Sequence, residues 1–135
     1  MTPRKSPDAL LRTIRARLAA EADPSRAPAM QAYMKSAMPF HGVPAPKVRA
    51  VCKDVFSSLG FASSAAWERE VRAIWDGARF REERYAAIAL THVRAARAFQ
   101  SPEAMPLYEH LIVTGAWWDF VDEIATNRVG PILRA

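Results

Sequence analysis

The strongest constraint on the fold is a regular succession of apolar segments with helical spacing, separated by short breaks rich in proline and glycine. Within each segment, apolar side chains recur every three or four positions, which places them on one face of an α-helix. Proline and glycine end these segments because neither residue favours a continuing helix. No stretch alternates apolar and polar residues as a half-buried strand would. The sequence therefore predicts an all-α chain.

About seven helices are expected from this periodicity, most of them in successive antiparallel pairs joined by short turns. The predicted ranges are Pro7–Ala22, Ala27–Ala37, Pro46–Leu59, Ser64–Gly77, Phe80–Phe99, Ser101–Thr114 and a seventh over the run that begins at Trp117 and breaks at Gly130. Paired helices favour a HEAT-like α-solenoid, and a plain helical bundle is the alternative. Residues 1–135 are expected to form a single domain.

The composition is that of a globular chain, with 50% hydrophobic and 24% charged residues. The single cysteine, Cys52, excludes an intramolecular disulfide and suits the reducing cytoplasm, where we expect the protein to be. Its helical spacing from Val48 and Val55 predicts a buried structural thiol. No apolar run is long enough to span a membrane. The three histidines are scattered, so neither a metal nor any other cofactor is expected.

The chain carries 19 lysines and arginines against 14 acidic residues, a formal charge of +5 and a pI near 9.9. A domain this basic is a candidate for binding a polyanion. Basic side chains that contact phosphates displace the counterions there, and the release of these counterions favours binding. The alternative is a set of arginines that decorate solvated helix faces. The basic residues are spread along the chain, which favours a broad electropositive surface over a basic tail.

The run WWDFVD at residues 117–122 is the most distinctive motif. If it is helical, one apolar face comprises Trp117, Phe120, Val121 and Ile124. Trp118 and Asp122 then lie four residues apart on a neighbouring flank, where their side chains can meet. A large aromatic beside a carboxylate can bind a flat or positively charged group. The alternative is that Trp118 packs on a neighbouring helix and Asp122 is solvated or ion-paired.

Two motifs together resemble a known family. The segment 33–43, YMKSAMPFHGV, is similar to the YMK…PFxGV segment of the DNA alkylation repair family, the HEAT-like alkylpurine DNA glycosylases. The run WWDFVD is similar to that family's WWDxVD, and it follows the first motif at the expected distance. Between them, Trp75 followed by the run that starts at Glu83 also fits the family pattern. The resemblance extends from about Leu10 to Arg134.

The resemblance implies a curved stack of helical pairs that receives duplex DNA on a basic concave face. It also implies excision of positively charged N3- and N7-alkylated purines by hydrolysis of the N-glycosidic bond, without a cofactor. By position, Asp122 corresponds to the family's catalytic carboxylate, and Trp118 to the aromatic that lies against the lesion-bearing nucleotide. Tyr33 corresponds to an aromatic near the same DNA surface.

Family members are longer than this chain, so we expect an N-terminal portion of the family's fold, either a truncated fragment or a natural short form. In both cases the missing half is expected to impair excision. Apolar surface left uncovered near the C-terminus is a candidate for self-association. Two other functions stay open: a non-catalytic HEAT-like module that binds DNA, and a helical scaffold that binds proteins. Of the features in the sequence, only Asp122 together with Trp118 favours catalysis.

Overall fold

The computed structural model describes residues 9–34, 36, 38–115 and 129–134. Its elements are α1 (Ala9–Ala20), α2 (Ala27–Met34), α3 (Ala45–Phe56), α4 (Ser64–Gly77), α5 (Arg81–His92), the 3-10 helices η1 (Arg94–Phe99) and η2 (Pro102–Ala104), α6 (Met105–Gly115) and α8 (Gly130–Arg134). Every regular element in these ranges is helical, which confirms the all-α prediction.

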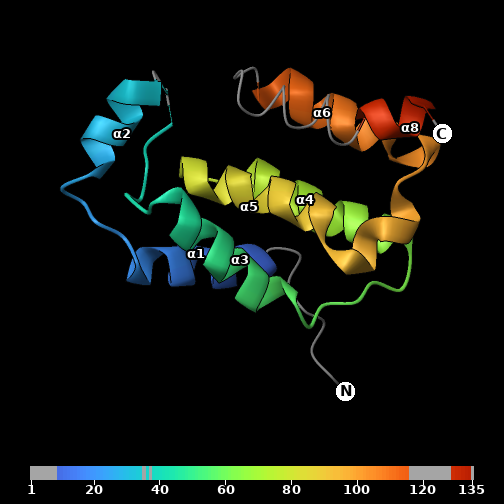
Figure 1. Ribbon diagram of the computed structural model, residues 1–135, viewed down its shortest axis with the longest axis horizontal. Helices are drawn as coiled ribbons and strands as arrows, with labels where there is room; N and C mark the ends of the chain where they lie inside the picture. The colour runs from blue at the N-terminus through green and yellow to red at the C-terminus, as the bar shows by residue number, and fades with distance from the viewer. Residues whose placement is uncertain (1–8, 35, 37, 116–128, 135) are drawn as a thin grey trace.

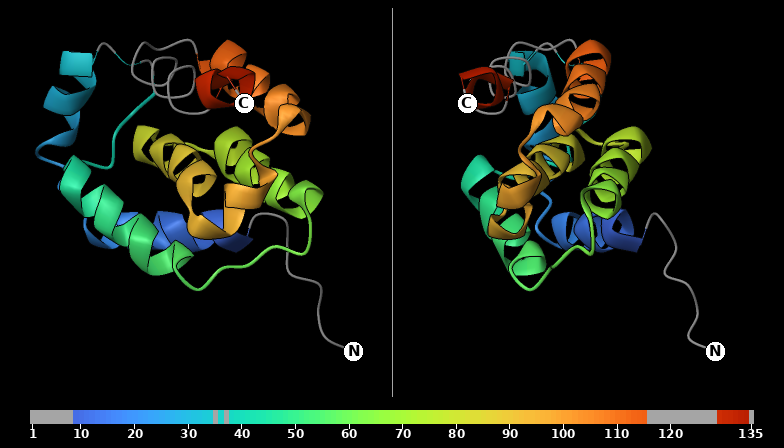
Figure 2. Two further views of the ribbon diagram at one scale, coloured as in Figure 1. Left: turned by 45° about the vertical axis from the view of Figure 1, so that its right-hand side comes forward. Right: turned by 90° about the vertical axis from the view of Figure 1, so that its right-hand side faces the viewer.

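The helices stack in layers, as in a solenoid. Helices α1 and α3 form one layer, α4 and α5 form the next, and α6 with α8 lies beyond them (Figure 1). The turned views of Figure 2 keep the same order. Helix α2 stands outside this stack, on the side where α6 lies (Figure 1). This arrangement leaves α2 as an outlying element that other parts of the chain must hold in place.

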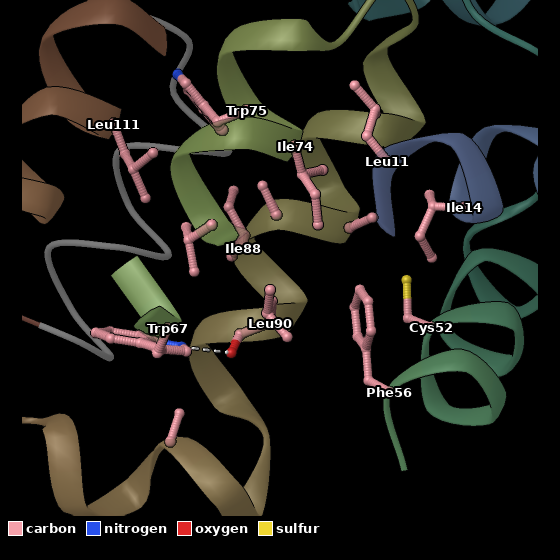
Figure 3. Packing of buried hydrophobic residues seen from close by; sticks show 14 of the residues in the cluster. Leu11, Ile14, Cys52, Phe56, Trp67, Ile74, Trp75, Ile88, Leu90 and Leu111 are labelled. Carbon is pink, nitrogen blue, oxygen red and sulfur yellow. Dashed lines mark hydrogen bonds between the residues drawn. The ribbon is translucent and has the colours of Figure 1, made fainter. Parts of the chain in front are cut away.

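Helix α5 is the centre of the core, because it packs against α1, α3 and α4. Its Ala86 and Ala87 are fully buried, and these small side chains let neighbouring helices approach closely. Larger apolar residues from each neighbour join them in the core, and Figure 3 shows Ile14 of α1, Phe56 of α3 and Ile74 of α4. Burying one such large side chain contributes about 1.5–3 kcal/mol, so this core is the main source of stability.

Helix α4 begins and ends where the sequence predicts. The Ser63 hydroxyl accepts a hydrogen bond from the backbone N–H of Ala66 at 3.1 Å, which caps the first turn. The helix ends at Gly77, also as predicted. Its two tryptophans, Trp67 and Trp75, are buried. The Trp75 indole donates to the hydroxyl of Thr114 at 2.7 Å and so ties α4 to α6.

The prediction of one long helix from Phe80 to Phe99 is wrong. Helix α5 ends at His92, Val93 is extended with a ψ of 150°, and a 3-10 helix follows. Side chains supply hydrogen bonds to the carbonyls that the break exposes. The Trp67 indole donates to the Leu90 carbonyl at 3.1 Å (Figure 3). The Gln100 amide donates to the Thr91 carbonyl at 3.3 Å. These distant partners make the interruption possible.

Three other helices are shorter than predicted. Helix α1 ends at Ala20 instead of Ala22, α3 ends at Phe56 instead of Leu59, and α2 ends at Met34 instead of Ala37. Beyond α2, the Ser36 hydroxyl donates to the Met38 carbonyl at 2.8 Å and accepts from its N–H at 3.1 Å. Such local side-chain bonds compete with helical ones. The sixth predicted helix starts as a 3-10 turn, and most of the seventh lies outside the described residues.

Candidate functional site

Tyr33 is the one predicted site residue that lies within the described ranges. It is on α2, and its side chain is 85% exposed. No residue of α2 is buried, so this helix is not held in place by an apolar face of its own. Among the described residues, the segments at the two ends of α2 therefore contribute to the position of Tyr33.

The two ends of α2 are joined at Gly42. Asp23 precedes α2 and Gly42 follows it. The backbone N–H of Asp23 donates a hydrogen bond to the Gly42 carbonyl at 3.1 Å. Gly42 has a φ of 89°, a conformation that favours glycine. A Cβ at this position would lie 2.0 Å from the Asp23 carbonyl oxygen. The close approach that closes this excursion of the chain therefore requires glycine.

The loop that contains Gly42 is fixed by a buried carboxylate. One oxygen of Glu82, in the first turn of α5, accepts the backbone N–H of His41 at 2.9 Å. The other oxygen accepts the N–H groups of Gly42 at 2.9 Å and Val43 at 3.0 Å. Glu82 is only 1% exposed. Three charge-assisted bonds in a buried setting make a strong attachment.

The next residue, Glu83, is the second half of this attachment. Its carboxylate lies 2.7 Å from His41 Nε2 and accepts hydrogen bonds from the Arg15 guanidinium, the shortest at 2.8 Å, and from the backbone N–H of Arg79 at 2.9 Å. The His41 ring also stacks on Phe80, with centroids 3.8 Å apart. We call Glu82 and Glu83, with the loop 41–43 that they hold, the carboxylate clamp.

The environment of Glu83 stabilises its charged form. Burial by itself would raise the pKa of this carboxyl. Hydrogen bonds from His41, Arg15 and the backbone of Arg79, together with the charge of Arg15, outweigh burial and lower the pKa from 4.5 to about 2. The carboxylate therefore stays ionised at neutral pH, as a stable anion and not as an acid ready to give up a proton.

Arg81 completes the contact between α5 and the loop. Its backbone N–H donates to the Pro39 carbonyl at 2.9 Å, and its side chain is 1% exposed. The guanidinium carbon lies 5.9 Å from the Phe40 ring and 5.7 Å from the Tyr85 ring, within cation–π range. Phe40 is itself buried, so the loop is held by apolar packing as well as by hydrogen bonds.

These contacts give the clamp a positioning role. Its carboxylates are buried and saturated with hydrogen-bond donors, which leaves no accessible oxygen for a substrate. The clamp fixes the loop that follows α2 against the first turn of α5, while Tyr33 on α2 is exposed to solvent. The sequence reasoning overlooked Glu82, Arg15 and Arg81, and it used Glu83 only as part of a pattern. The sequence held two signals for the clamp: the two acids at the start of a predicted helix, and the loop PFHGV at residues 39–43.

The other two predicted site residues, Trp118 and Asp122, lie outside the described residues. Their meeting on one helix flank stays a prediction. Among the described residues, no three His, Cys, Asp or Glu side chains gather as metal ligands would. In the same part of the chain, no helix has the length and apolar character needed to cross a bilayer.

Layers of packed helices, with a short tethered helix that presents an exposed aromatic, define a solenoid-like all-α protein. The chain belongs to the DNA alkylation repair enzyme family, whose model matches residues 14–135. The suspected family is thereby confirmed, and it makes DNA repair the general function. The match includes Tyr33 and the clamp as well as the run WWDFVD. No curated protein matches the chain.

Proposed function

We propose that this protein excises cationic N3- or N7-alkylated purines from duplex DNA by hydrolysing the N-glycosidic bond. The single observation that carries the proposal is the family match over residues 14–135, which spans all three candidate residues. The exposed Tyr33, on the helix that precedes the carboxylate clamp, supports a surface that receives DNA. The formal charge of +5 supports it too, because duplex DNA is a polyanion.

The chemistry suits a single carboxylate. An alkylated purine is positively charged and leaves as a neutral base when the bond between its nitrogen and C1′ breaks. The bonding electrons go to the base, and positive charge develops on the deoxyribose. In this proposal the Asp122 carboxylate stabilises that charge and accepts a proton from the water that adds to C1′. The Trp118 ring favours the cationic sugar and base through its electron-rich face.

In this proposal Tyr33 contacts the DNA near the lesion. An exposed aromatic can stack on a base or pack on a sugar, and such stacking contributes about 1–3 kcal/mol. Because α2 has no buried residue, we expect the clamp to contribute to where Tyr33 lies. Tyr33→Ala should therefore weaken binding to alkylated duplex and leave the rate of base release from bound DNA largely unchanged.

The decisive experiment measures base release from duplex DNA that contains N7-methylguanine. Asp122→Asn is expected to lower release at least about 100-fold, a loss of about 3 kcal/mol of transition-state stabilisation. The matched control is Asp119→Asn, which removes an acid of the same motif and should leave release within about twofold of wild type. Equal effects of the two substitutions, or no release by the wild-type chain, would refute the proposal.

The second candidate function is a non-catalytic module that binds DNA, and the net positive charge supports it equally. The same experiment separates the two. Tight binding of the alkylated duplex without any base release by the wild-type chain would favour the binding module. Binding that disappears by about 0.2 M salt, without preference for the lesion, would instead indicate charge alone and favour a protein scaffold.

A further inference from the structure

A trough runs between α3 and α5. Two cavities of about 580 and 630 Å³ lie there. Both are lined by Arg49, Cys52, Ala89 and His92, so they adjoin and form one hollow. We call it the α3–α5 trough. Each part has the size of a ligand-binding pocket.

The floor of the trough is apolar. Val48, Phe56 and Ile88 form it with Cys52, and all four are 6% exposed or less. Figure 3 shows Cys52 and Phe56 projecting from α3 into the core. Burial raises the pKa of the Cys52 thiol to about 12, so this residue is an inert part of the floor and not a nucleophile. Such a floor fits apolar side chains or an apolar ligand.

The rim of the trough is cationic. Arg49 and Lys53 are exposed and lie four residues apart on α3, and Arg94 lies across from them, just beyond the end of α5. No ion pair between these three cations and an acidic side chain is present in the described part of the chain. One carboxylate, that of Glu82, is among the described lining residues, and the clamp already occupies its oxygens.

Floor and rim together select the kind of partner. Cations four residues apart on a helix are about 6 Å apart along its axis, which suits several carboxylates better than a single small anion. A DNA backbone would satisfy the rim, but it has no apolar side chains to fill the floor. An amphipathic helix with acidic residues beside its apolar face satisfies both. We propose that the α3–α5 trough binds an acidic amphipathic helix of a partner protein.

The test uses a labelled peptide and the full chain. The probe is a fluorescein-labelled peptide of about 18 residues, with leucines at helical spacing on one face and glutamates flanking them. A peptide of the same composition in scrambled order is its control. Binding is measured by fluorescence anisotropy. Arg49→Glu changes the rim, Ala89→Trp fills the trough without a change of charge, and Arg69→Glu, at an exposed position on α4, is the matched control.

The ordered peptide is expected to bind saturably, at least about tenfold tighter than the scrambled one. Arg49→Glu and Ala89→Trp should each weaken it at least about tenfold, whereas Arg69→Glu should change it less than about twofold. Equal binding of the two peptides, or equal effects of Arg49→Glu and Arg69→Glu, would overturn the proposal. So would efficient displacement of the peptide by a short undamaged duplex, which would assign the trough to DNA. None of these results depends on base release.

Discussion

Replacing Gly42 with alanine tests whether the excursion that carries Tyr33 is closed as described. The new Cβ would lie 2.0 Å from the Asp23 carbonyl oxygen, so that backbone must retreat by at least about 1 Å to reach ordinary contact. Alanine at a φ of 89° costs a further 1–3 kcal/mol or so. The retreat also breaks the bond from the Asp23 N–H to the Gly42 carbonyl, worth about 1 kcal/mol.

Together the strained φ and the lost hydrogen bond predict a loss of about 2–4 kcal/mol, a large part of the stability of a typical domain. Urea unfolding monitored by tryptophan fluorescence measures this loss, which should lower the urea midpoint by about 2 M. Gly60→Ala is the matched control, because no atom lies within 4 Å of a Cβ built there. It should cost less than about 0.5 kcal/mol. If Gly42→Ala cost no more than Gly60→Ala, the close approach to Asp23 would be refuted.

Two further substitutions test other parts of the molecule. Glu83→Gln should lower the free energy of unfolding by about 2 kcal/mol at pH 7. The lowered pKa of Glu83 alone corresponds to about 3 kcal/mol, and we expect less because Arg15, its ion-pair partner, is partly exposed to water. A carboxyl whose pKa falls to about 2 on folding stabilises the protein fully above about pH 4.5. The difference in unfolding free energy between wild type and Glu83→Gln should therefore shrink as the pH is lowered from about 4.5 to about 2. Glu109→Gln, on the surface of α6, should show no such gap. Trp67→Phe leaves the buried Leu90 carbonyl without its indole donor and should cost about 1–3 kcal/mol in thermal unfolding; a loss below about 0.5 kcal/mol would mean that this bond does not support the end of α5.

Signals that are local in the sequence predicted the fold well. The start of α4 at Ser64, its end at Gly77 and the burial of the Cys52 thiol were all predicted correctly, because each depends on residues within one or two turns. The helical class followed from periodicity alone. The end of α5 could not be predicted in this way, since the break at Val93 depends on donors from Trp67 and Gln100. Those partners are distant in sequence or lie beyond the break.

The clamp could not be predicted for a related reason. Two acids in the first turn of a helix are usually solvent-exposed, where they complement the helix dipole. Nothing in the neighbourhood of Glu82 distinguishes that case from burial, because its partners lie about 40 residues earlier in the loop at His41. The resemblance pointed to the loop without giving its physical reason. The three N–H groups that converge on one carboxylate supply that reason.

The sequence separation of these contacts also bears on how the protein folds. The bonds of Glu82 join residues 39–41 positions apart, and that of Arg15 to Glu83 joins residues 68 apart. Closing loops of this length before the helices have packed carries an entropy cost that few contacts offset, so the clamp is expected to close after the folding transition state. Interactions that form late affect the rate of unfolding more than the rate of folding. The clamp thus determines how long Tyr33 stays in place, while the α4–α5 core determines how quickly the chain first folds.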